Sequence, residues 1–128
     1  MILIDSSAWI EFLRGTGSPA CDRVEVLLAD DIAVCDAIRM EILAGARSDA
    51  HLTDLRALLG RATVLPTTPV HYEQAAGLFR RARSSGVTVR RLVDCLIGAV
   101  AIDYQTPVLH ADRDFDALAS VSPLQVAR

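Results

Sequence analysis

Three aspartates stand at alternate positions in the segment VLHADRDFDAL, residues 108–118, directly after an apolar run. Carboxylates this close together repel one another unless a cation or hydrogen bonds stabilise their charge. Asp112 and Asp114 can supply oxygen ligands to a hard divalent cation such as Mg²⁺ or Mn²⁺. The spacing therefore points to metal-assisted chemistry, provided that acids from elsewhere in the chain reach the same place.

Three further acids occupy positions where a merely solubilising charge is not expected. Asp5 directly follows the apolar run 2–4, and Asp94 lies within the apolar segment 92–102. Glu41 lies on the shoulder of the apolar stripe of a predicted helix. A lone buried carboxylate costs several kcal/mol unless a partner compensates its charge. One bound divalent cation would explain all of these acids together, because a metal neutralises crowded carboxylates.

Each acid also has a structural interpretation that the sequence leaves open. Asp5 and Asp114 are each placed to cap a helix. Glu41 can pair with a nearby arginine, and Asp94 can pair with one of the arginines at 90–91. The histidines and the three cysteines are scattered and show no spacing typical of a zinc site.

The composition narrows the classes of function. The chain has 128 residues, enough for one domain with its own core, and its net charge is −3. All 13 basic residues are arginine, which argues against chemistry that needs a lysine, including Schiff bases, P-loops and phosphorylated receiver domains. Residues 5–7 read Asp-Ser-Ser, so the DxD motif of a haloacid-dehalogenase phosphatase is absent.

The N-terminal residues and the apolar runs indicate in which cellular compartment the protein is expected. MILID at the N-terminus lacks the basic region of a signal peptide. The longest apolar run, 95–102, is too short to cross a bilayer. We therefore expect a cytoplasmic protein without membrane association, in which the cysteines are buried thiols.

Short apolar strands alternate with helices along the chain. Strands are predicted at 2–4, 32–34, 62–66 and 107–110, with a further edge strand at 122–126. Helices are predicted over residues 5–15, 18–30, 36–46, 48–59, 69–85, 92–104 and 114–119. The expected N-terminal caps of the first four helices are Ser6 or Ser7, Ser18, Asp36 and Ser48. This alternation predicts an α/β fold with three α/β/α layers and a mainly parallel central sheet flanked by helices.

The predicted strands bring distant acids together. In an open parallel sheet, functional groups gather beyond the carboxyl ends of the strands. Asp5 ends the first strand, and Asp112 and Asp114 follow the fourth. These acids share one edge of the sheet if the two strands are parallel neighbours.

Over essentially its whole length, the chain resembles a PIN-domain protein, and within that family a VapC-type ribonuclease toxin. The resemblance rests on four segments in order: MILIDSSAWIEFLRG at 1–15, RMEILAGAR at 39–47, LVDCLIGAVA at 92–101 and PVLHADRDFDALA at 107–119. It implies a single PIN domain over residues 1–128. It also implies an endoribonuclease that depends on Mg²⁺, with Mn²⁺ as a substitute, and that is held inactive by a cognate VapB-type antitoxin.

The resemblance assigns roles residue by residue. The catalytic acids that it implies are Asp5, Glu41, Asp94 and Asp112, and the metal site comprises the same four together with Asp114. Ser6 or Ser7 matches the hydroxyl residue that orients the first acid or a metal-bound water. Cys95 departs from the family, which usually has a small residue directly after the helical aspartate.

A ring of acids repels RNA, so positive side chains must hold the backbone of the substrate. Arg90, Arg91 and Arg113 lie close to the acids in sequence and are predicted to bind RNA phosphates. The alternative is that these arginines pair with the acids. The resemblance further implies a homodimer and a transfer RNA or ribosomal RNA substrate. A non-catalytic PIN-like module that binds RNA or a protein partner remains the alternative from another class.

Overall fold

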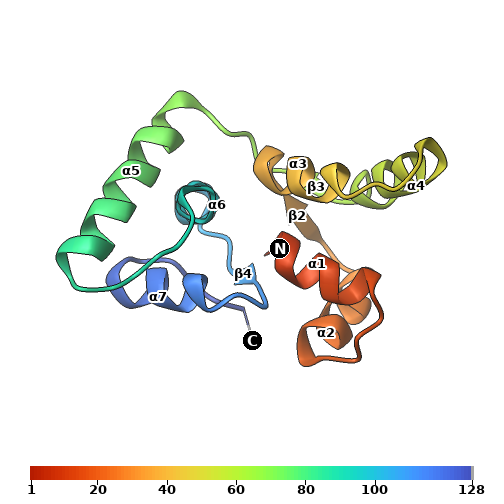
Figure 1. Ribbon diagram of the computed structural model, residues 1–128, viewed down its shortest axis with the longest axis horizontal. Coiled ribbons are helices and arrows are strands. Elements are labelled where there is room, and N and C mark those ends of the chain that lie inside the picture. The colour runs from red at the N-terminus through yellow and green to blue at the C-terminus, as the bar shows by residue number, and fades with distance from the viewer. Residues whose placement is uncertain (128) are drawn as a thin grey trace.

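Four short apolar strands form the centre of the structure, which is a computed structural model that describes residues 1–127 (Figure 1). They are β1 (Ile2–Ile4), β2 (Ile32–Val34), β3 (Thr63–Val64) and β4 (Val108–Leu109). All of them pair in parallel, in the order β3-β2-β1-β4. The first and fourth strands are therefore parallel neighbours, as the placement of the acids requires.

Seven helices within residues 1–127 cover the two faces of this sheet. They are α1 (Ser6–Leu13), α2 (Pro19–Leu27), α3 (Asp36–Ala44), α4 (Asp49–Leu59), α5 (Pro69–Ser84), α6 (Leu92–Asp103) and α7 (Arg113–Val121). Figure 1 shows α1 to α4 on one side of the strands and α5 to α7 on the other. The arrangement confirms the predicted α/β/α layers. No helix within these residues is both long enough and apolar enough to span a bilayer.

Two helix starts confirm the predicted caps. The side chain of Ser18 accepts a hydrogen bond from the Cys21 N–H at the start of α2. The side chain of Ser48 accepts one from the His51 N–H at the start of α4. Each serine has extended backbone dihedrals, so its hydroxyl can reach back to an amide that lacks a helical partner.

Two other predicted caps are wrong. Ser6 and Ser7 are already helical, and Asp5 caps α1 by accepting a hydrogen bond from the Ser7 N–H, which confirms the structural interpretation of Asp5. Asp36 is the first helical residue of α3, and the cap position is Cys35, which makes no side-chain cap bond. Each cap lies one or two residues earlier than expected, because a single residue joins each strand to the helix that follows it.

The last strand and the tail are shorter than predicted. The expected edge strand at 122–126 is reduced to a single parallel bridge between Val108 and Val126. The Val108 N–H donates to the Gln125 carbonyl at 2.9 Å, and the Ala127 N–H donates to the Val108 carbonyl at 2.8 Å. The tail thus lies beside β4, on the far side from β1.

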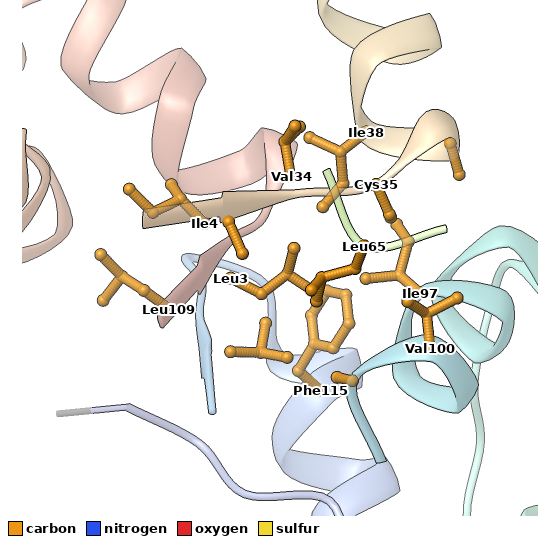
Figure 2. Close-up of a cluster of buried hydrophobic side chains, with 14 of the residues drawn as sticks. Leu3, Ile4, Val34, Cys35, Ile38, Leu65, Ile97, Val100, Leu109 and Phe115 are labelled. Atoms are coloured by element: carbon orange, nitrogen blue, oxygen red, sulfur yellow. The ribbon is translucent and has the colours of Figure 1, made fainter. Parts of the chain in front are cut away.

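The core fixes α6 and α7 against the sheet. Leu3, Ile97, Val100 and Phe115 have no exposed surface and meet on one face of the strands (Figure 2). On the opposite face, Figure 2 shows Ile38 of α3 packed over the strands. Because α6 and α7 carry acids in their first turns, this packing also determines where those acids lie.

We expect Phe115→Ala to lower the free energy of unfolding by about 3–5 kcal/mol, because it leaves a cavity in a site with no exposed surface. Chemical denaturation of the metal-free protein measures the loss. Val26→Ala, at a side chain of α2 that is 62% exposed, is the control and should change stability by less than about 0.5 kcal/mol. Equal losses in the two variants would contradict this description of the core.

Candidate active site

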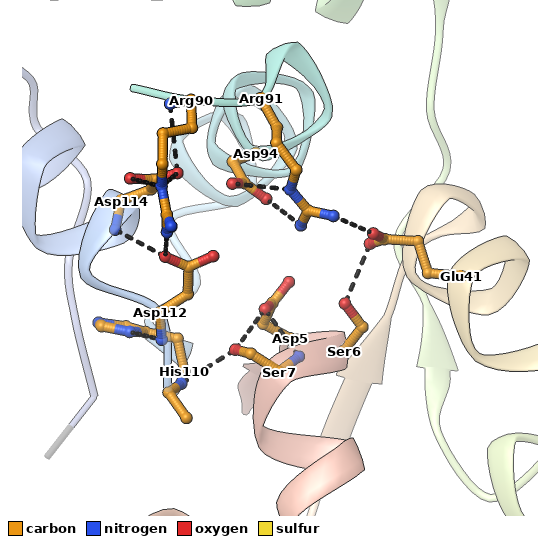
Figure 3. A network of polar contacts seen from close by, with 11 residues as sticks. Asp5, Ser6, Ser7, Glu41, Arg90, Arg91, Asp94, His110, Asp112 and Asp114 are labelled. Carbon is orange, nitrogen blue, oxygen red and sulfur yellow. Dashed lines mark hydrogen bonds and ion pairs between the residues drawn. The ribbon is translucent and has the colours of Figure 1, made fainter. Parts of the chain in front are cut away.

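The five predicted acids come together at the carboxyl edge of the sheet (Figure 3). Asp5 directly follows β1, and Asp112 follows β4 at the cap of α7. Asp94 and Asp114 lie in the first turns of α6 and α7, and Glu41 projects from α3. Three of the five, Asp5, Asp94 and Asp114, have at most 2% of their surface exposed.

Asp5 is both a helix cap and a buried carboxylate. Its Oδ2 accepts hydrogen bonds from the Ser7 N–H at 3.0 Å and the Ser7 hydroxyl at 2.6 Å. Its Oδ1 is buried and has no hydrogen-bond partner within residues 1–127. Figure 3 shows this second oxygen directed toward the side on which Asp94 and Glu41 lie. An unsatisfied buried carboxylate oxygen is costly, so this atom indicates a missing partner.

The two serines after β1 hold different acids. Ser7, one of the two serines for which the resemblance implies this role, donates to Asp5, and its Oγ also accepts the Ala111 N–H at 2.9 Å, which ties α1 to the segment after β4. Ser6 donates instead to Glu41 Oε1 at 3.0 Å. Adjacent positions at the start of α1 therefore fix two acids from different elements.

Arg91 joins two of the acids. Its Nη2 donates to Asp94 Oδ1 at 2.8 Å and its Nε to Asp94 Oδ2 at 3.4 Å, while its Nη1 donates to Glu41 Oε2 at 3.0 Å. Burial raises the pKa of Asp94 to about 6, and this effect outweighs the lowering by Arg91. The same contacts raise the pKa of the Arg91 guanidinium, with the hydrogen bond to Asp94 as the main cause.

Arg90 joins the acids around the start of α7. Its Nη2 donates to Asp112 Oδ1 at 2.8 Å, and its Nε donates to Asp114 Oδ1 at 3.2 Å. The Arg90 backbone N–H also donates to Asp114 Oδ2 at 3.3 Å. The Asp114 N–H donates to Asp112 Oδ1, so Asp112, rather than Asp114, caps α7. The interpretation of Asp114 as the cap is therefore wrong.

The backbone explains why neighbouring arginines reach different acids. Arg91 has extended dihedrals, with φ −129° and ψ 130°. On an extended chain, successive side chains point to opposite sides. Figure 3 accordingly shows Arg90 directed toward α7 and Arg91 toward α3.

The electrostatic balance of the site remains negative. Five carboxylates surround two guanidinium groups, and the pKa of Asp5 is raised, chiefly by burial and also by the neighbouring charge of Glu41. A further cation would lower both the free-energy cost of burying these charged carboxylates and their mutual repulsion.

The donor set fits a hard divalent cation. One oxygen each from Asp94, Asp112 and Asp114 lies within 4.8 Å of the others. The free Oδ1 of Asp5 adds a fourth oxygen at the same edge. Carboxylate oxygens without nitrogen or sulfur are the ligands that Mg²⁺ and Mn²⁺ prefer.

Other residues take positions outside this centre. Arg113 is exposed and makes no ion pair with the described part of the chain. Cys95 is fully buried, and burial raises the pKa of its thiol to about 11. His110, which the sequence places near the acids as a structural or rim residue, accepts the Asp112 N–H through Nδ1 at 3.0 Å. The spacing of two residues between them is the only signal in the sequence for this contact.

Known proteins provide an independent comparison. The PIN domain family matches residues 2–121. Ribonuclease VapC11 of Mycobacterium tuberculosis is 44% identical over 131 aligned residues, which cover 99% of this chain and 98% of the relative.

Solved structures share the fold. VapBC2 from Rickettsia felis, bound to a DNA fragment from its promoter, has a TM-score of 0.78 at 14% identity and covers 99% of this chain and 98% of that chain. VapBC-1 from nontypeable Haemophilus influenzae has a TM-score of 0.77 at 18% identity, with coverages of 99% and 97%. Together with the family match and the VapC11 relative, these findings show that the chain belongs to the PIN-domain family and, within it, to the VapC ribonuclease toxins.

Proposed function

We propose that this ribonuclease toxin cuts RNA by metal-assisted hydrolysis, with Asp5, Glu41, Asp94 and Asp112 as its catalytic acids. The observation that carries the proposal is the buried, unpartnered Oδ1 of Asp5 beside acids from three other elements. Asp5, Asp94 and Asp112 would hold Mg²⁺ or Mn²⁺ directly, and Glu41 would bind the same ion directly or through a bound water. Asp114, which Arg90 holds in place, would contribute a further oxygen, because one of its oxygens lies within 4.8 Å of oxygens of Asp94 and Asp112.

The residues around the acids prepare the site for hydrolysis. When bound, a divalent cation lowers the pKa of its water and offsets negative charge on the attacked phosphate. Ser7 holds Asp5 in one orientation through two hydrogen bonds. Glu41, held by Ser6 and Arg91, is placed to orient the attacking water. The resemblance to the family implies products with 5′-phosphate and 3′-hydroxyl ends.

The RNA backbone needs positive contacts at the rim of this acidic site. Arg113 is exposed, has no carboxylate partner within residues 1–127 and is free to bind a phosphate. The side chains of Arg90 and Arg91 are 53% and 47% exposed, so each can also face the substrate. The substrate that we propose is a transfer RNA or ribosomal RNA.

The partners follow from the same family. The structural neighbours are VapBC toxin–antitoxin complexes. We accordingly propose a cognate VapB-type antitoxin as the partner of this chain. We also propose a homodimer, a cytoplasmic location and a single PIN domain over residues 1–128.

One observation favours a second candidate function. Arg90 and Arg91 pair with four of the five acids, which leaves part of the negative charge compensated without any metal. A module of this kind could bind RNA or a protein without cutting it. Metal-dependent cleavage by the isolated chain separates the two functions.

The isolated protein should cleave structured RNA with Mg²⁺ or Mn²⁺ and lose this activity in EDTA. Asp94→Asn should lower the rate about 100-fold or more, because it removes a carboxylate from the metal site. Asp54→Asn, at an exposed position on α4, is the matched control and should keep the wild-type rate. Gel analysis of end-labelled RNA measures all four conditions. Cleavage that survives both EDTA and Asp94→Asn would rule out the proposal.

Affinity for Mn²⁺ should fall about tenfold between pH 7 and pH 5. The raised pKa of Asp94, about 6, means that its carboxyl takes up a proton over this range. Only the deprotonated carboxylate binds a cation, so protonation opposes binding. Calorimetric titration at several pH values measures the change. An affinity that stays constant over this range would show that Asp94 is not a ligand.

Arg113→Gln should weaken RNA binding and reduce the dependence of log Kd on log salt concentration by about 0.7 for a single-stranded site. The reason is the loss of one phosphate contact. The matched control is Arg56→Gln, at an exposed position in α4, for which we expect an unchanged slope. Binding is measured with an Asp94→Asn background to prevent cleavage. If the two slopes are equal, Arg113 does not bind phosphate.

A further inference from the structure

The guanidinium of Arg91 lies between two of the acids that we propose for the metal site, Asp94 and Glu41. It donates to both oxygens of Asp94, at 2.8 Å and 3.4 Å, and to one oxygen of Glu41 at 3.0 Å. Ser6 occupies the other oxygen of Glu41 at 3.0 Å. Every carboxylate oxygen of these two acids therefore already accepts a hydrogen bond in this structure.

The other acids differ in how many of their carboxylate oxygens accept hydrogen bonds. Both oxygens of Asp114 accept from Arg90, one of them from its backbone. Asp112 accepts its two hydrogen bonds through Oδ1 alone, and Figure 3 shows its second oxygen facing the middle of the site. Within residues 1–127, Asp5 Oδ1 is also without a partner. The oxygens available to a cation thus lie on Asp5 and Asp112, opposite the Arg91 guanidinium.

We propose that Arg91 is an internal counter-cation that competes with the divalent metal for Asp94 and Glu41 and thereby sets the metal affinity of the site. The inference rests on the proposed function, because it takes these acids as metal ligands. Arg91 is a positioning residue here. It holds α3 and α6 acids together in the metal-free protein and gives way when a cation takes their oxygens.

The exposure of the contact makes such an exchange possible. Asp94 is fully buried, whereas the Arg91 side chain is 47% exposed. The guanidinium can therefore leave toward solvent without opening the core, and its charge remains hydrated when it does so. A divalent cation brings twice the charge of a guanidinium to the same carboxylates, which favours the exchange.

The exchange also links the metal to the substrate. A guanidinium released from Asp94 and Glu41 is free to bind a phosphate at the rim of the site. Metal binding should then strengthen RNA binding, and RNA should strengthen metal binding by the same factor, because linkage is reciprocal. Arg91 would thus pair with Asp94 and Glu41 before the metal binds and with a phosphate of the RNA afterwards.

The test is the dissociation constant of Mn²⁺ for the full-length protein without RNA, measured by electron paramagnetic resonance of the free ion. Arg91→Gln removes the competing charge and should bind Mn²⁺ about 3- to 30-fold more tightly. Arg91→Lys keeps the charge but loses the forked contact, so its affinity should fall between those of wild type and Arg91→Gln. Arg56→Gln, at an exposed position on α4 outside the site, removes one positive charge and should change the affinity less than about twofold.

The outcomes separate this inference from the proposed function. If Asp94→Asn abolishes Mn²⁺ binding while Arg91→Gln leaves the affinity unchanged or weakens it, the metal site stands and the role of Arg91 is wrong. If Asp94→Asn binds Mn²⁺ as well as wild type does, the metal site itself is wrong and the inference falls with it. Circular dichroism verifies folding, and Arg91→Lys supplies the comparison if Arg91→Gln does not fold.

Discussion

The burial of carboxylates at one edge of a parallel sheet is the constraint on which this structure depends. Asp5, Asp94 and Asp114 have almost no exposed surface, and burial raises the pKa of both Asp5 and Asp94. Such groups destabilise a fold unless donors and positive charge surround them. The helix starts, the two serines after β1 and the arginines before α6 all supply that compensation.

This compensation connects elements that are far apart in sequence. Ser7 links the first helix to the segment after β4, and Ser6 links it to α3. Arg91 continues the chain of contacts from α3 to α6, and Arg90 continues it to α7. Polar contacts from neighbouring residues therefore hold the acids of four elements at fixed positions, as a site that acts on a phosphodiester requires.

Much of the fold could be predicted from local patterns. Apolar runs located all four strands, and Ser18 and Ser48 marked the starts of their helices correctly. The errors at Ser6, Ser7 and Asp36 have one cause, since only one residue separates each strand from its helix and that residue takes the cap position. The tail formed one bridge rather than a strand, because its pairing depends on β4, which is itself short.

The sequence alone predicts which acids form the site, but it does not predict which arginines pair with them. The alternation of strands and helices predicts parallel pairing, whereas the pairing of β1 with β4, which brings Asp5 and Asp112 to one edge, is known only from the structure. The sequence leaves open whether Arg90 and Arg91 contact RNA or the acids, because their partners depend on the extended backbone at Arg91 and on distances of about 3 Å. The contact between His110 and the Asp112 N–H likewise arises from a local turn that no periodicity reveals.

The pairing of the tail with β4 limits how this molecule can associate with others. Gln125 to Ala127 cover the outer side of β4, and β3 at the opposite end contains two residues. Within residues 1–127, the sheet therefore offers little open backbone to which a foreign strand could add. A partner that binds the helices instead recognises their side chains, so its specificity can change through surface substitutions that leave the sheet intact.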